Sequence, residues 1–193
     1  MPEDPASPAA PLVEVLDALE RLGVRHHLGG SYASSIHGLP RQTRDADLVV
    51  DLKPTTVPLL AAALRPTFYL DEDRMRQAVS RRSSVNLIHL ATGFKVDLFV
   101  KGDGPFDDLE LARSRPADLP GTAERQVPVA SAEDTILRKL LWFKAGGGTS
   151  ERQWLDVLGI LKVQHGSLDD EYLAEWATEL DVRELLERAL REA

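Results

Sequence analysis

The fold is decided by residues 26–52, HHLGGSYASSIHGLPRQTRDADLVVDL. The run 24–28 predicts a short strand that leads into Gly29-Gly30, and Ser31 is placed to cap a short helix that ends at Gly38. A loop over 39–44 then precedes a β-rich, buried run at 46–52. A strand, a glycine turn, a helix and a second strand within 27 residues indicate a mixed α/β fold.

The flanking sequence extends this alternation of strands and helices. Residues 85–92 and 94–101 alternate in polarity across Thr92-Gly93 and predict an antiparallel hairpin. Helical spacing predicts further helices, and after 126–131 only helices are expected. The expected helices lie at 12–22, 54–65, 107–113, 132–146, 150–164, 169–179 and 181–192, with a polar helix or extended loop at 71–82.

These patterns predict the fold class α/β (α+β), with a small mixed β-sheet, flanking helices and a helical C-terminal part. Three segments follow from the same patterns. Residues 1–10 read as a disordered tail, residues 11–130 as the α/β core, and residues 131–193 as the helical C-terminal subdomain.

Composition excludes several classes of protein. The 193 residues include 31 acidic and 23 basic side chains, a formal net charge of -8, which disfavours bulk non-specific DNA binding. There is no cysteine, so disulfide scaffolds, thiolate metal sites and cysteine nucleophiles are excluded. No signal peptide and no apolar run near the roughly 18 residues of a membrane span is present. We therefore expect a cytoplasmic protein with no membrane partner.

Three aspartates suggest a metal site. Asp45 and Asp47 at the start of a strand point to one face, about 6–7 Å apart, where two carboxylates repel unless a cation lies between them. Asp97 lies inside the apolar run FKVDLFV, where an acid is rarely left unpaired. Three carboxylates from neighbouring strands could hold two Mg²⁺ ions, which activate an attacking oxygen and stabilise leaving pyrophosphate.

The Gly29-Gly30-Ser31 turn suggests a phosphate site. Glycines allow close backbone approach, a helix N-terminus favours an anion, and Ser31 adds a hydroxyl. Further along the chain, a basic segment without acids is either a solvated helix face or a surface for an RNA acceptor or a triphosphate. Its arginines are Arg74, Arg76, Arg81 and Arg82.

Three motifs resemble the nucleotidyltransferase-fold superfamily, the DNA polymerase β-like fold, and most closely its small bacterial AbiEii-like members. They are LGGS (28–31), GLPRQTRDADLVV (38–50) and KVDLFV (95–100). The helical runs AEDTILRKL (132–140) and ERQWLDVLGIL (151–161) also resemble this group, so the resemblance covers roughly residues 24–162.

The resemblance implies transfer of a nucleoside monophosphate from an NTP, such as ATP, to an acceptor, with Mg²⁺ or Mn²⁺ as cofactor. It implies that Asp45, Asp47 and Asp97 hold the metal and that Asp97 can act as base. Gly29, Gly30 and Ser31 would hold the triphosphate. Arg41 and Lys139, with Arg152 as a further candidate, would meet phosphate or acceptor. The acceptor is open between an RNA end, a protein and a small molecule, and some relatives are toxin–antitoxin components.

Simpler interpretations and other functions stay open at this stage. Arg44 beside Asp45 could pair with it, Thr43 could only support the loop, and Arg152 could pair with Asp156 along one helix. The same fold could serve as a non-catalytic nucleotide- or partner-binding module. A metal-dependent phosphohydrolase ranks last, because no His/Asp cluster of that kind is present.

Overall fold

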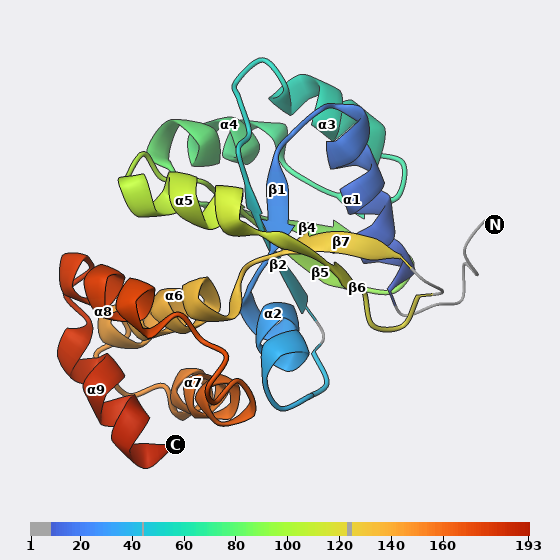
Figure 1. Ribbon diagram of the computed structural model, residues 1–193. Coiled ribbons are helices and arrows are strands. Elements are labelled where there is room, and N and C mark those ends of the chain that lie inside the picture. The colour runs from blue at the N-terminus through green and yellow to red at the C-terminus, as the bar shows by residue number, and fades with distance from the viewer. Residues whose placement is uncertain (1–8, 44, 123–124) are drawn as a thin grey trace. The chain divides into compact units, whose positions relative to one another are not determined.

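The computed structural model describes residues 9–43, 45–122 and 125–193. The chain forms two compact units (Figure 1). The first combines the described residues up to Leu28 with those between Thr43 and Val129, and the second combines Gly29–Gln42 with Ala130–Ala193. The predicted boundaries at 10/11 and 130/131 stay predictions. The second unit also contains the segment that follows the first strand.

The first unit is built on a mixed β-sheet. In the described residues its strands run in the order β3-β4-β5-β2-β1-β7-β6. β2 and β5 are parallel, whereas β4 with β5 and β1 with β2 are antiparallel. The strands are β1 (His26–Leu28), β2 (Asp45–Val50), β3 (Phe68–Tyr69), β4 (Ser84–His89), β5 (Lys95–Val100), β6 (Arg115–Asp118) and β7 (Gln126–Val129).

The two faces of this sheet differ in polarity because successive side chains of a strand point to opposite sides. On β2, Ala46, Leu48 and Val50 are buried, and on β5 Val96 and Leu98 are fully buried beside them. The alternate positions of β2 and β5 carry the three aspartates. The apolar alternation therefore anchors one face in the core and leaves the other face for polar side chains.

Helices of the first unit complete its core. α4 (Glu72–Arg81) contacts β4 and β5, and it also contacts α3 (Val57–Leu64), which in turn contacts α1 (Ala10–Arg21). α4 begins at Asp71, whose side chain accepts a hydrogen bond from the backbone N–H of Arg74. The first unit also contains α5 (Pro105–Arg113). The 71–82 segment is thus a helix rather than an extended loop.

The second unit is helical. It contains α2 (Gly30–His37), α6 (Ala132–Ala145), α7 (Glu151–Val163), α8 (Asp170–Glu179) and α9 (Arg183–Glu192). α2 contacts α6 and α7, and Figure 1 shows it beside them although about 90 residues separate α2 from α6 in the sequence. The contact with α7 is close at Gly38, where an added Cβ would lie 2.9 Å from the backbone nitrogen of Ile160.

The structure confirms the mixed α/β fold and the predicted hairpin. β4 and β5 pair in antiparallel register, and Gly93 takes a φ of +70° in the turn between them. The prediction that Ser131 caps a helix is also confirmed, because its side chain accepts from the N–H of Asp134. The predicted Ser31 cap is wrong. Gly29 is the N-cap residue of α2, and Ser31 lies inside that helix. No helix in the described ranges has the length and apolar character to cross a membrane.

Candidate functional site

The three aspartates lie on adjacent strands of the first unit. Asp47 of β2 is in register with Asp97 of β5, and Asp45 is in register with Lys95. Directly paired residues of neighbouring strands share a face, so Asp45, Asp47 and Asp97 all lie on one face of the sheet. The structure therefore brings the predicted carboxylates together on the face opposite the apolar core.

Neighbouring side chains hold two of these carboxylates in place. The hydroxyl of Thr43 donates to Asp45 Oδ1 at 2.8 Å and also to the Asp45 backbone carbonyl at 2.9 Å. The Asn86 side-chain amide donates to Asp97 Oδ1, and Lys95 Nζ lies 2.7 Å from Asp97 Oδ2. Thr43 thus orients an aspartate rather than only supporting the loop. Arg44, the other predicted partner of Asp45, lies outside the described residues.

Lys95 is the cation of this face. Its Nζ lies 3.9 Å from Asp45 Oδ2 as well as 2.7 Å from Asp97 Oδ2. The hydrogen bond to Asp97 raises the pKa of Lys95 above its ordinary value. Burial opposes the rise, and the charges of Asp97, Asp45 and Asp47 add to it. Lys95 therefore stays charged at neutral pH.

The donor set of this face suits a hard divalent cation, because it offers carboxylate oxygens and already attracts an ammonium group. Three carboxylates and one ammonium leave a formal charge of -2. Among the described residues, no group of three or more acidic or histidine side chains is arranged to hold a metal ion. The predicted metal site therefore stays a prediction, and binding there requires Lys95 to move away from Asp97.

The predicted phosphate-binding turn begins the second unit. Gly29 and Gly30 are buried, and Gly30 has a φ of +52°, a backbone conformation that favours glycine. α2 begins here with no side-chain cap and no acidic residue in its first turn. A helix N-terminus of this kind favours an anion.

The Ser31 hydroxyl is the meeting point of two arginines. Arg41 Nη2 donates to Ser31 Oγ at 2.5 Å, and Arg152 Nη2 donates to the same oxygen at 2.9 Å. The predicted Arg152–Asp156 helix pair is therefore replaced by a contact with α2. Two guanidinium groups thus share one neutral acceptor oxygen, which is a weaker acceptor for them than an anion would be.

Asp156 joins Arg41 to the buried Lys139. Its carboxylate accepts from Arg41 Nε and Nη2, both at 3.0 Å, and from Lys139 Nζ at 2.6 Å. Lys139 also donates to Gln153 Oε1 at 3.1 Å. Burial tends to raise the pKa of Asp156, but the bonds from Arg41 and Lys139 outweigh it and lower the pKa below its ordinary value. With Arg152, which reaches the same Ser31 hydroxyl as Arg41, three cations and one anion give this cluster a formal charge of +2.

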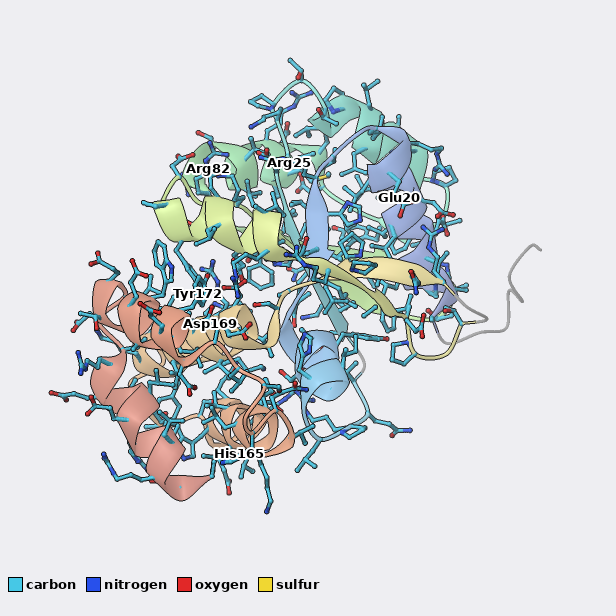
Figure 2. The ribbon with its side chains drawn as sticks, in the orientation of Figure 1. Glu20, Arg25, Arg82, His165, Asp169 and Tyr172 are labelled. Atoms are coloured by element: carbon cyan, nitrogen blue, oxygen red, sulfur yellow. The ribbon has the colours of Figure 1, made fainter. Side chains whose placement is uncertain are left out.

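The four predicted arginines of the first unit do not act as one patch. Arg76 pairs with Glu72 at 2.6 Å, and Arg82, labelled in Figure 2, pairs with Asp103 at 2.7 Å. Arg74 Nε lies 3.6 Å from Asp71 Oδ2. The segment contains no acid, but acids just outside it in sequence reach back to three of its arginines. Arg81 alone of the four has no ion-pair partner among the described residues.

Sequence reasoning missed Lys95, Asn86 and Gln153 as members of these clusters. Lys95 stands two positions before Asp97, so strand alternation would have placed both on one face. Its position beside Asp45, and that of Asn86 beside Asp97, depend on strand register. No local pattern of residues in the sequence shows that register.

No protein-family model matches the sequence, and no curated protein matches it. Solved structures do match. The antibiotic-resistance factor ANT(2'')-Ia is 14% identical with a TM-score of 0.53, over 96% of this chain and 97% of that one. An antigenic nucleotidyltransferase-like protein from Paracoccidioides brasiliensis is 18% identical with a TM-score of 0.54, over 94% and 91%.

These likenesses identify the fold. The chain has the nucleotidyltransferase fold, with the mixed sheet and helices described above. At these identities the similarity extends to fold alone. The AbiEii-like subgroup stays a prediction.

Proposed function

We propose that the protein is a nucleotidyltransferase that moves a nucleoside monophosphate from an NTP to an acceptor hydroxyl. The observation that carries the proposal is the placement of Asp45, Asp47 and Asp97 on one face of neighbouring strands in a nucleotidyltransferase fold. The second unit supports the proposal with a cluster of positive charge around Ser31, formed by Arg41, Arg152 and Lys139.

Asp45, Asp47 and Asp97 would hold Mg²⁺ or Mn²⁺. When bound, such an ion neutralises charge on the transferred phosphoryl group and lowers the pKa of a bound oxygen. Thr43 keeps one oxygen of Asp45 oriented, as the supporting residues of metal ligands do. Lys95 gives the carboxylates a cation partner in the absence of the ion.

The triphosphate, with ATP as one candidate, would bind the second unit at Gly29, Gly30 and Ser31. Arg41 and Arg152 already donate to Ser31 Oγ, and phosphate oxygens would take these donors as stronger acceptors than a hydroxyl. Asp156 fixes Arg41 and Lys139 before the nucleotide arrives. Prior positioning of charge in this way is the main source of catalysis in phosphoryl transfer.

The proposed reaction is an in-line displacement. The acceptor oxygen forms a bond to the α-phosphorus, and the bond from that phosphorus to the oxygen shared with the β-phosphate breaks. Pyrophosphate leaves with the electron pair, and the acceptor proton passes to Asp97. Asp97 is suited to accept it, because its carboxylate lies on the same face as Asp45 and Asp47.

The test is incubation with each labelled NTP, Mg²⁺ or Mn²⁺, and pools of cellular RNA, protein and small metabolites. Label should move to one acceptor pool and pyrophosphate should be released. Asp47→Asn should abolish transfer. Asp51→Asn is the matched control, because Asp51 follows the same strand but its carboxylate pairs with the exposed cations Arg25 and Lys53. Release of inorganic phosphate instead would indicate a phosphohydrolase.

A second candidate is a non-catalytic binding module, favoured by the contacts of Asp97. Asn86 and Lys95 occupy both of its carboxylate oxygens. This candidate predicts nucleotide binding without turnover, so transfer of label to any acceptor excludes it. The AbiEii resemblance further suggests a toxin–antitoxin component. Growth arrest on expression that Asp47→Asn relieves would support that role.

A further inference from the structure

A pocket of about 310 Å³ lies in the first unit at the β4 edge of the sheet. It is formed where α4 passes the outer strands β3 and β4. Its lining includes Tyr69, Arg74, Gln77, Arg81, Ser84 and Asn86. This volume is at the small end of ligand pockets, large enough for one ring with its substituents.

Strand register connects this pocket to the aspartates. Asn86 lines the pocket and donates to Asp97. A second row of directly paired residues runs from Tyr69 to Ile88, then to Lys95 and Asp45. Ala78 and Val85 also line the pocket from the apolar side, so the pocket lies at the β4 edge of the sheet. Asn86 connects this edge to Asp97, one strand away.

The pocket offers three kinds of contact. Tyr69 is 64% exposed and presents an aromatic ring, with Ile88 paired beside it. Arg81 is a guanidinium with no carboxylate partner in the described chain, suited to a carboxylate or phosphate. The backbone N–H of Val100 donates to the Ser83 carbonyl, and the N–H of His89 donates to the Phe94 carbonyl. These two hydrogen bonds show which residues of β4 bond to β5. Because successive residues of a strand alternate, the main-chain N–H and C=O groups of Ser84 and Asn86 face away from β5. Both residues line the pocket, so these groups are its third kind of contact.

The charges favour a small acid over a polyanion. Arg76 and Arg82 do not line the pocket and are paired with Glu72 and Asp103. Asp71 also lines the pocket, and it lies 3.6 Å from Arg74, so these two charges offset each other. A bound RNA needs several cations along its backbone, whereas the pocket concentrates its available charge at Arg81.

We propose that this pocket holds the acceptor, a small alcohol that carries one planar ring and one acidic group. The ring would stack on Tyr69, the acid would pair with Arg81, and the hydroxyl would point along Asn86 toward Asp97. The inference rests on the proposed function, since it assigns the acceptor of that reaction. No sequence pattern marked Tyr69, because its neighbours in the pocket come from α4 and β4.

The test is a nuclear magnetic resonance titration of the full chain with 4-(hydroxymethyl)benzoate, read at the amides of Ser84 and Asn86. Arg81→Gln should weaken binding about tenfold, the loss of one charged hydrogen bond. It should leave the neutral 4-(hydroxymethyl)benzamide unchanged. Tyr69→Leu should weaken both ring compounds about threefold or more and leave ringless 4-hydroxybutanoate unchanged. Arg76→Gln, on the same helix but outside the pocket, is the matched control.

Three results would overturn the proposal. One is equal affinity in wild type, Arg81→Gln and Tyr69→Leu. Another is stronger binding of the polycationic amino sugar kanamycin at the same amides. The third is binding of an RNA oligonucleotide that falls equally when each of the four arginines is replaced. Arg81 and Tyr69 are both exposed, so we expect the variants to fold, and a thermal melt of each variant checks this.

Binding is measured without NTP, in wild type and in Asp47→Asn, so that it is independent of turnover. Absence of transfer to every acceptor, with binding still dependent on Arg81 and Tyr69, contradicts the proposed function and supports a ligand pocket. If label is transferred to an acceptor at the same rate in wild type, Arg81→Gln and Tyr69→Leu, the pocket is not the acceptor site. The proposed function is then still supported.

Discussion

Replacement of Asp156 by asparagine tests the charge cluster of the second unit. The substitution keeps the size of the side chain but removes the anion that faces Arg41 and Lys139. Lys139 is only 2% exposed and would keep the neutral side-chain amide of Gln153 as an acceptor. Removal of one member of a buried ion pair costs about 3–5 kcal/mol. We expect about 3 kcal/mol, because Arg41 is partly exposed and can turn to water.

The assay is urea and thermal unfolding followed by circular dichroism. A loss of about 3 kcal/mol lowers Tm by about 6–12 °C for a chain of this size. Asp181→Asn is the control, because Asp181 also pairs with a lysine but is fully exposed, and its Tm should match wild type. The double substitution Asp156→Leu with Lys139→Met should recover much of the loss, since it leaves no unpaired buried lysine. A loss below about 1 kcal/mol in Asp156→Asn would refute the reasoning.

Three further predictions follow from individual contacts. Because the pKa of Asp156 is lowered in the folded protein, its carboxylate stabilises the fold fully above about pH 4, and this stabilisation is lost as the pH falls through the lowered pKa. The urea midpoints of wild type and Asp156→Asn should therefore converge in acid. Thr43→Val should weaken Mn²⁺ binding by about 10–100-fold in calorimetry, because Asp45 loses its orienting hydroxyl, whereas Thr43→Ser should not. Gly38→Ala should cost about 1–3 kcal/mol in urea unfolding, because its Cβ meets rigid backbone. Gly23→Ala, where the space is open and only a φ of +65° is strained, should cost about 1 kcal/mol.

Local patterns in the sequence predicted the elements that they control. The alternation of 85–101 predicted β4 and β5, and Ser131 with Asp134 predicted the start of α6. β3 was not predicted, because two residues carry no periodic signal and Phe68–Tyr69 is fixed by pairing with β4. β6 was missed for a similar reason, since Pro116 and its charged neighbours do not alternate in polarity.

The candidate site shows a similar division. The sequence placed Asp45 and Asp47 on one face from their spacing alone. It could not place Lys95 between Asp45 and Asp97, because this depends on parallel register between strands about 50 residues apart. It could not foresee that α2 packs with α6 and α7 either. That packing gives Ser31 two arginine donors instead of a capping role.

The same limit applies to the arginines of α4. A window without acids predicted a basic patch, but Asp71, Glu72 and Asp103 lie outside the window and pair with Arg74, Arg76 and Arg82. Net charge counted along the sequence therefore overstated the exposed positive charge. That Arg81 is the one of these four arginines with no ion-pair partner in the described part of the chain can be seen only in the fold.

The most direct test of nucleotidyl transfer is pyrophosphate release from α-labelled NTP, measured together with label on the acceptor. Wild type and Asp51→Asn should release pyrophosphate in equal amount to label transferred. Asp47→Asn should show neither above background, because the shared carboxylate face of β2 and β5 has lost one of its charges. Equal transfer by Asp47→Asn and wild type would contradict the assignment of the carboxylates. Nucleotide binding with no pyrophosphate from any NTP and acceptor pool would contradict the enzyme itself.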